Sequence, residues 1–240
     1  AEASFPLQQF YLIPWRWSYF IQHRCEDDQP RSRLARLYRI YWLGVMDYAL
    51  HLQILLMERV LRSRRSIRFS FRHIVPAFLI RNWKVTDRSS SMLVMKHEAF
   101  RHIEIELFVP RDQLADALDF AQETIEVAGG RQSTLSADNQ PRIEGLGMQE
   151  DLAGLHDQYF HHYPLCVRRV LPDDTLISMA SGSGQDWYAL SFISYAKPAR
   201  RAGFHLFASF MARSMSRLFH ARPHWGKVCP LEADELTSLY

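Results

Sequence analysis

HIEIELFVPRDQLADALDFAQETIEVAGG, residues 102–130, passes from a period of two to a helical period within one segment. The apolar side chains of its first part occupy every second position: Ile103, Ile105, Leu107 and Val109. The intervening positions are His102, Glu104, Glu106 and Phe108. Side chains of a strand point alternately to its two faces, so this pattern predicts a β-strand with one buried face that ends at Pro110.

An apolar stripe at helical spacing follows the strand. Its members are Leu114, Leu118, Ala121, Ile125 and Ala128. The stripe predicts an amphipathic helix, and Gly129 and Gly130 supply the residues that commonly end one.

Later segments repeat these two patterns. We expect strands over 163–171 and 186–195, joined through 176–179 and the turn SGSGQD (181–186). A second amphipathic helix is expected over 199–220, and the polar residues 131–151 are expected to form a loop. The order strand, helix, strand, strand, helix predicts an α+β domain with an antiparallel sheet and helices on one face, similar to a split βαβ unit.

Composition excludes several classes of protein. The chain has 240 residues, of which 48% are hydrophobic and 23% charged, which is typical of a globular protein and not of a disordered or fibrous one. Its length fits one large domain or two small ones. A net charge of +3 gives the chain as a whole little attraction for nucleic acid, so no nucleic-acid partner is expected.

Cysteines and histidines indicate neither disulfides nor metal. Cys25, Cys166 and Cys229 are far apart, form no CxxC pair, and are odd in number. This usage fits a reducing compartment, so we expect a cytoplasmic protein. No HExxH motif occurs among the eleven histidines, and no metal site is predicted.

Residues 34–62 form a long apolar run that predicts a helix. Asp47, His51 and Gln53 interrupt the run, which counts against a membrane span. Two alternatives remain: a helix buried on most sides, or an interfacial helix that makes peripheral membrane contact through 31–65, because arginines flank both ends.

The basic run RSRRSIRFSFR (62–72) also has more than one interpretation. Its charges can bind phosphate or RNA, or can simply be a solvated face. The alternation of Ile67, Phe69 and Phe71 with polar residues also suits a half-exposed strand.

The segment ARPHWGKVCPL (221–231) carries a more specific motif, with His224, Trp225, Gly226 and Lys227 in succession. It resembles the C-terminal signature of the aldonolactone oxidases, a branch of the vanillyl-alcohol-oxidase flavoprotein superfamily. That branch includes enzymes oxidising gulono-, galactono- and D-arabinono-1,4-lactone, and the alditol oxidases.

Two further segments agree with this resemblance. VRRVLPDDTLISMASGSGQDWYALSF (167–192) is similar to a family stretch in which an arginine, here Arg168, precedes paired acids. The segment 86–118 is similar to the family's entry into its substrate domain. One departure is Cys166, where the family usually carries a glutamate, and it puts ordinary recognition of a sugar lactone or polyol in doubt.

The resemblance implies a division of the chain and a missing partner. Residues 86–240 are expected to be the α+β substrate (cap) domain of the vanillyl-alcohol-oxidase type, with 1–85 as an aromatic and helical N-terminal segment packed on it. The family's separate FAD-binding domain is expected to be absent from this chain. That domain, on the same or a separate polypeptide, is therefore the expected partner, and the chain alone is expected to be inactive.

The same resemblance assigns roles to four residues. Lys227 would lie beside the flavin and stabilise negative charge on the reduced ring. His224 would contact the flavin or carry the substrate proton. Arg168 would clamp substrate oxygen with its planar donor fork, and Cys166, two residues earlier on the same strand face, would line the same pocket.

The function implied is oxidation of a sugar-lactone or polyol hydroxyl by hydride transfer to FAD, as in the D-arabinono-1,4-lactone oxidases. The alternative is a non-catalytic binding or membrane-docking module derived from the cap domain.

Overall fold

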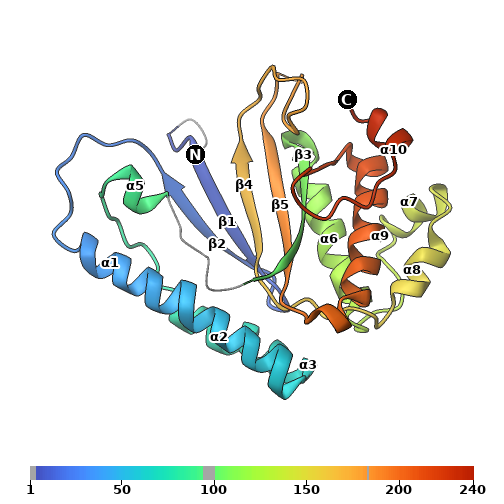
Figure 1. The fold of residues 1–240 in the computed structure, drawn as a ribbon, viewed down its shortest axis with the longest axis horizontal. Helices are drawn as coiled ribbons and strands as arrows, with labels where there is room; N and C mark the ends of the chain where they lie inside the picture. Colours follow the sequence, from blue (N-terminus) through green and yellow to red (C-terminus); the bar gives the residue numbers. More distant parts are fainter. Residues whose placement is uncertain (1–3, 94–100, 183) are drawn as a thin grey trace.

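A six-stranded antiparallel sheet forms the centre of the protein (Figure 1). The structure is a computed structural model and describes residues 4–93, 101–182 and 184–240. The strands are β1 (Leu7–Ile13), β2 (Ser18–Arg24), β3 (Ile103–Pro110), β4 (Leu165–Val170), β5 (Trp187–Ser194) and β6 (Arg222–Pro223). Their order across the sheet is β2-β1-β4-β5-β3-β6. The α+β class with an antiparallel sheet is therefore confirmed.

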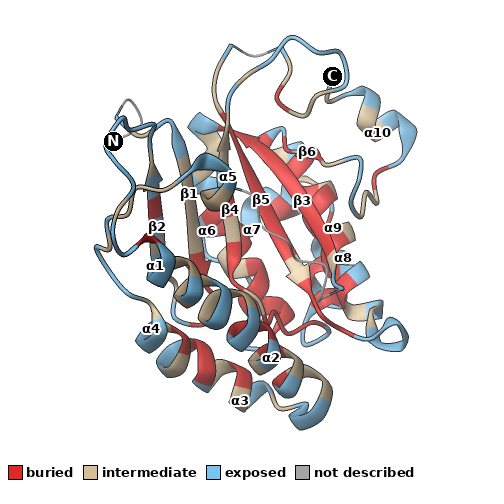
Figure 2. Ribbon diagram, turned by 60° about the vertical axis from the view of Figure 1, so that its left-hand side comes forward, coloured by how far each residue is buried: buried red, intermediate tan, exposed pale blue. Residues whose placement is uncertain are grey.

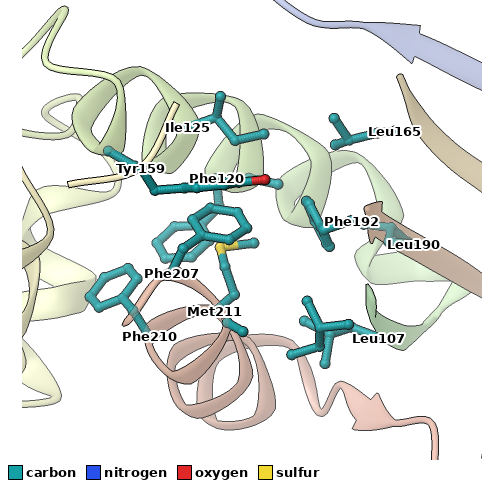
Figure 3. Packing of buried hydrophobic residues seen from close by; sticks show 14 of the residues in the cluster. Leu107, Phe120, Ile125, Tyr159, Leu165, Leu190, Phe192, Phe207, Phe210 and Met211 are labelled. Atoms are coloured by element: carbon teal, nitrogen blue, oxygen red, sulfur yellow. The ribbon is translucent and has the colours of Figure 1, made fainter. Parts of the chain in front are cut away.

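Two amphipathic helices cover one face of the sheet, as the periodicity predicts. They are α6 (Leu114–Ala128) and α9 (Ala202–Phe219). Phe207 and Met211 of α9 and Phe120 of α6 are fully buried against Leu107 and Phe192 of the sheet (Figure 3). Full burial of a side chain of this size contributes roughly 1.5–3 kcal/mol, so this layer is the main hydrophobic core.

The loop expected over 131–151 is wrong in part. Residues Gln140–Gly145 form α7 and Gln149–Leu155 form α8, which pack beside α6 and α9 (Figure 1). Their buried side chains are Ile143, Met148, Leu152 and Leu155. Both helices are short and the glycines between them interrupt the stripe, so no helical period is visible in the sequence.

An N-terminal hairpin extends the sheet beyond the predicted strands. Strand β1 pairs with β2 on one side and with β4 on the other. Its turn holds Trp15 and Trp17 at φ of 66° and 56°, and the indole of Trp15 stacks on Phe160 with ring centroids 4.1 Å apart. Residues 7–24 thus share one sheet with the rest of the chain, and the division at residue 85 stays a prediction.

Residues 35–78 form a helical arm on the other side of the sheet from α6 and α9 (Figure 2). It consists of α1 (Ala35–Tyr41), π-helical turns over Trp42–Ala49, α2 (Leu50–Leu55), π-helical turns over Leu56–Leu61, then α3 (Arg64–Phe69), π-helical turns over Ser70–Ile74 and α4 (Val75–Phe78). The short helices α5 (Ser89–Met92) and α10 (Ala233–Thr237) and the 3₁₀ turns Arg111–Gln113 and Pro198–Arg200 complete the described elements.

The arm confirms one expectation and corrects two. The predicted helix exists, but burial on most sides is wrong: only 17% of its most apolar 18-residue window is buried. The strand alternative for 62–72 is also wrong, because that run is helical. By length and composition alone, the 27-residue helix Ala35–Leu61 is long and apolar enough to cross a membrane, with a mean hydropathy of 1.3 over that window.

Candidate active site on the polar face of the sheet

A row of side chains crosses four strands on the face opposite the main core. Glu106 of β3 is the register partner of Ser191 on β5, Ser191 of Cys166 on β4, and Cys166 of Tyr11 on β1. Residues directly opposite one another in an antiparallel pair point to the same face. The pairing therefore brings these four side chains together from three distant parts of the sequence. We call this surface the polar face.

Glu106 holds Arg168 on the polar face. Its Oε1 accepts a hydrogen bond from Nη2 of Arg168 at 2.6 Å and from Oγ of Ser191 at 3.1 Å. Glu106 is 2% exposed, whereas the side chain of Arg168 is 50% exposed. Burial by itself lowers the pKa of Arg168, but the charge and hydrogen bond of Glu106, together with the nearby Cys166 and Glu104, raise that pKa overall. A buried carboxylate thus fixes a guanidinium that still reaches solvent.

Glu104 holds Lys227 in the same way. Its Oε2 lies 2.5 Å from Nζ of Lys227 and 3.5 Å from Nε2 of His102. Burial by itself raises the pKa of Glu104, but the hydrogen bonds from His102 and Lys227 and the Lys227 charge lower it to about 2. The carboxylate is therefore ionised at neutral pH, and the ammonium is held at the edge of the polar face with a third of its side chain exposed.

Cys166 is a neutral thiol at physiological pH. Burial raises its pKa to about 11, against a smaller opposing effect of Arg168. Nε2 of Gln9 lies 3.1 Å from its sulfur and 2.7 Å from the hydroxyl of Tyr11. Burial also raises the pKa of Tyr11, so this part of the polar face is uncharged beside the charged pairs.

His224 follows β6 and continues the row beyond Glu106. Its backbone N–H donates to the carbonyl of Glu106 at 2.9 Å. Its Nδ1 accepts the N–H of Gly226 at 2.9 Å. In the neutral ring the proton therefore sits on Nε2, which makes that nitrogen a hydrogen-bond donor.

The two motif-bearing segments contact each other. Nε1 of Trp225 donates to the carbonyl of Ile177 at 2.9 Å, and Nη1 of Arg222 donates to the carbonyl of Ser181 at 2.8 Å. The guanidinium of Arg222 also lies 4.6 Å from the ring centroids of both Trp187 and Tyr240. The C-terminal segment is thereby fixed against the β4–β5 connection.

The paired acids belong to that connection and not to the polar face. Asp173 accepts hydrogen bonds from Thr175 and from Oγ of Ser178, the latter at 2.5 Å, and these bonds lower its pKa. They close a local turn, so Asp173 shapes the loop.

The structure brings together the residues predicted from sequence and adds others. Lys227, Arg168 and Cys166 lie on the polar face, and His224 is joined to it through its backbone. Sequence reasoning missed the residues that hold them: Glu104, Glu106, Ser191, Gln9 and Tyr11. The alternation in 102–109 does place both glutamates away from the core, but a strand with one buried face is wrong, since both glutamates are buried as well. Among the described residues, no group of three or more His, Cys, Asp or Glu is arranged to hold a metal ion.

Comparison with known proteins identifies the family of the chain. The sequence profile of the D-arabinono-1,4-lactone oxidase family matches residues 9–240. A long-chain alcohol oxidase from an uncultured marine euryarchaeote is 85% identical over all 240 residues, and the chain spans 50% of that relative's length. The match covers nearly the whole chain, including both glutamates, the residues that they hold and the C-terminal motif. The chain therefore belongs to the D-arabinono-1,4-lactone oxidase family.

Proposed function

We propose that this chain forms the substrate half of an FAD-dependent oxidoreductase that oxidises a CH–OH group by hydride transfer. The observation that carries the proposal is the Lys227 ammonium, held on the polar face by a buried and ionised Glu104. Membership of an oxidase family and the name of the 85% identical relative support the same reaction class.

The residues present fit a flavin. Lys227 and His224 supply a cation and an Nε2–H donor from one segment, and both belong to the motif that the family carries. These two residues would hold the edge of the ring, while an FAD-binding domain, on the same or a separate polypeptide, would bind most of the cofactor. The chemistry that bound FAD would supply is that of a hydride acceptor. A nearby cation stabilises the negative charge that develops on the ring when it is reduced.

Arg168 would bind and orient the substrate hydroxyl. Its planar guanidinium reaches the open side of the polar face, and Glu106 fixes its direction. In the neutral ring of His224 neither nitrogen is free to accept the hydroxyl proton, because Nδ1 accepts the N–H of Gly226 and Nε2 carries the ring proton. Contact with the cofactor through the Nε2–H is therefore the better supported of the two roles assigned to this histidine.

Two substrate classes follow from the family and from the relative. A sugar lactone or polyol is the class that the family name suggests, as in D-arabinono-1,4-lactone oxidation. A long-chain alcohol is the class named for the relative. The neutral thiol of Cys166 favours the second class, because a thiol cannot accept hydrogen bonds from several hydroxyls as a carboxylate does.

The test is turnover by the chain joined to an FAD-binding domain, with Lys227→Met as the variant. We expect the rate of flavin reduction by substrate to fall about 10²–10³-fold, which is the usual loss when one charge-stabilising group is removed. The exposed Lys197, at the start of a short 3₁₀ turn, provides the control Lys197→Met, whose rate should stay unchanged.

The alternative is a non-catalytic binding module, and the exposed apolar arm is the observation that favours it. Absence of flavin reduction in the parent chain joined to an FAD-binding domain would support that alternative, and unchanged flavin reduction in Lys227→Met would contradict the role proposed for Lys227. The chain without an FAD-binding domain should show no turnover in either case.

A further inference from the structure

The outer side of the helical arm exposes apolar residues where a surface helix normally exposes polar ones. The exposed positions recur every four residues, at Ile40, Gly44, Tyr48, Leu52, Leu56 and Val60. π-Helical turns contain more residues than the 3.6 of an α-helix, so their mixture with α-helical turns brings positions four apart onto one line. The row therefore follows a single side of the arm, and Val60 within it is 67% exposed.

Two polar residues of this helix contact the protein body. His51 is 4% exposed, with its ring 5.5 Å from that of Tyr195. Glu58 forms an ion pair with Arg200 at 3.1 Å. The side of the arm that contacts the protein body is buried and carries these polar groups together with apolar residues such as Ile54, whereas the side that faces away is exposed (Figure 2) and carries the aliphatic row.

A hollow opens between the two halves of the arm. Its volume is about 420 Å³, and the residues that line it include Leu56, Met57, Leu61, Phe69 and Ile74. Leu56, Leu61 and Phe69 are exposed, so the hollow is continuous with the apolar row. Its lining is suited to hydrocarbon.

Positive charge surrounds this apolar surface. Residues 31–81 contain eleven arginines, whereas Asp47 and Glu58 are their only acidic residues. The formal charge of this stretch is +9 and that of the whole chain is +3, so all other residues together carry −6. Arg33 and Arg36 near one end of the arm and Arg62 and Arg65 near the other are exposed, and the described residues offer them no ion-pair partner.

We propose that the outer side of the arm docks on the surface of an anionic lipid bilayer. The apolar row and hollow would enter the acyl region, and the arginines at both ends would bind headgroup phosphates. Charge excludes a second copy as the better occupant, because a two-fold interface places the same patch on both partners and would bring +9 against +9. The helix lies along the bilayer without crossing it, since its inward residues are held by the body.

Vesicle cosedimentation of the chain tests this proposal. Vesicles of phosphatidylcholine with phosphatidylglycerol should bind the chain, vesicles of phosphatidylcholine alone should bind it weakly, and added salt should release it. The double variant Leu52→Gln, Leu56→Gln should weaken binding at least about tenfold. Arg62→Gln with Arg65→Gln should weaken it about thirtyfold at low salt, since each arginine near the surface contributes about 1 kcal/mol.

Control measurements distinguish a lipid bilayer from the other possible occupants of the apolar row. Leu206 in α9 is 51% exposed on the other side of the molecule, so Leu206→Gln should bind vesicles like the parent chain. Failure of the parent chain to bind anionic vesicles overturns the proposal. A parent chain that self-associates and loses this association in the Leu52→Gln, Leu56→Gln variant also overturns the proposal, because a second copy would then cover the apolar row. Loss of vesicle binding when the chain is joined to an FAD-binding domain overturns it as well, because that domain would then cover the row. Circular dichroism confirms that each variant is folded.

Discussion

The polar face of the sheet and the outer side of the helical arm distribute their residues in opposite ways. On the polar face, Glu104 and Glu106 are buried and each holds one cation. On the arm, leucines are exposed and several arginines have solvent around them. Burying a charge is costly unless it is paired, and a row of exposed aliphatic side chains gains nothing in water. These two arrangements are the basis of the two proposals, which place substrate binding on the polar face and membrane docking on the arm.

Removing the buried charge of Glu104 sharpens this comparison most. Because its pKa is lowered to about 2, Glu104 stabilises the fold fully above its ordinary value near 4.5, and this contribution is lost as the pH falls toward 2. This contribution to the free energy of unfolding is on the order of 3 kcal/mol. Glu104→Gln should lower the free energy of unfolding in urea at pH 7 and flatten its dependence on pH below 4.5. Glu150→Gln, an exposed carboxylate in α8, is the control. An unchanged pH dependence in Glu104→Gln would contradict the buried pair.

Glu106→Gln is expected to act on substrate binding more than on chemistry. The amide keeps the shape of the side chain but removes the charge that fixes Arg168. Solvent screens the half-exposed guanidinium, so the free energy of unfolding should fall by only about 1–2 kcal/mol. KM should rise about tenfold with a smaller change in kcat, in the chain joined to an FAD-binding domain. A fall in kcat with KM unchanged would show that Glu106 does not act through Arg168.

Cys166→Glu tests the uncharged part of the polar face. It restores the family's usual carboxylate two residues before Arg168, beside the donor Nε2 of Gln9. We expect the ratio of kcat/KM for alditols and aldonolactones to that for long-chain alcohols to rise about tenfold, which corresponds to about 1.4 kcal/mol. Cys166→Ser keeps a small neutral group and should leave the ratio near that of the parent. An equal ratio in all three proteins would show that Cys166 does not determine which substrate is preferred.

The arm should tolerate polar substitution in solution. Leu52 is 57% exposed, so Leu52→Gln should change the free energy of unfolding by no more than about 0.5 kcal/mol. Ile54, which is fully buried two residues later, gives the contrasting variant Ile54→Gln, with a loss of several kcal/mol. Equal losses in the two variants, measured by urea unfolding, would show that Leu52 is covered within the chain.

Periodicity predicted the part of the fold in which each element buries one side. The order β3, α6, β4, β5, α9 follows from the alternation in 103–109 and from the stripes of the two helices. The hairpin β1–β2 gave no comparable signal, because aromatic residues occur on both of its faces. Helices α7 and α8 are too short for a stripe.

The candidate site could be predicted only where a motif is local in sequence. Lys227 and Arg168 were found through their motifs, but their partners were not. Glu106 lies 62 residues from Arg168, and Glu104 lies 123 residues from Lys227. These groups are brought together by the register of β3, β4 and β5 and by the path of the chain after β6. Neither the register nor that path can be read from spacing in the sequence. Exposure of the arm was equally hidden, since a buried helix and an exposed apolar one have the same composition.

The most direct test of this account measures flavin reduction and vesicle binding on the same two variants, each joined to an FAD-binding domain. Lys227→Met should lose flavin reduction by substrate and keep its binding to anionic vesicles. The Leu52→Gln, Leu56→Gln double variant should keep flavin reduction by a soluble substrate and lose vesicle binding. Loss of both properties in either variant, or flavin reduction that survives in Lys227→Met, would contradict the assignment of chemistry to the polar face and docking to the arm.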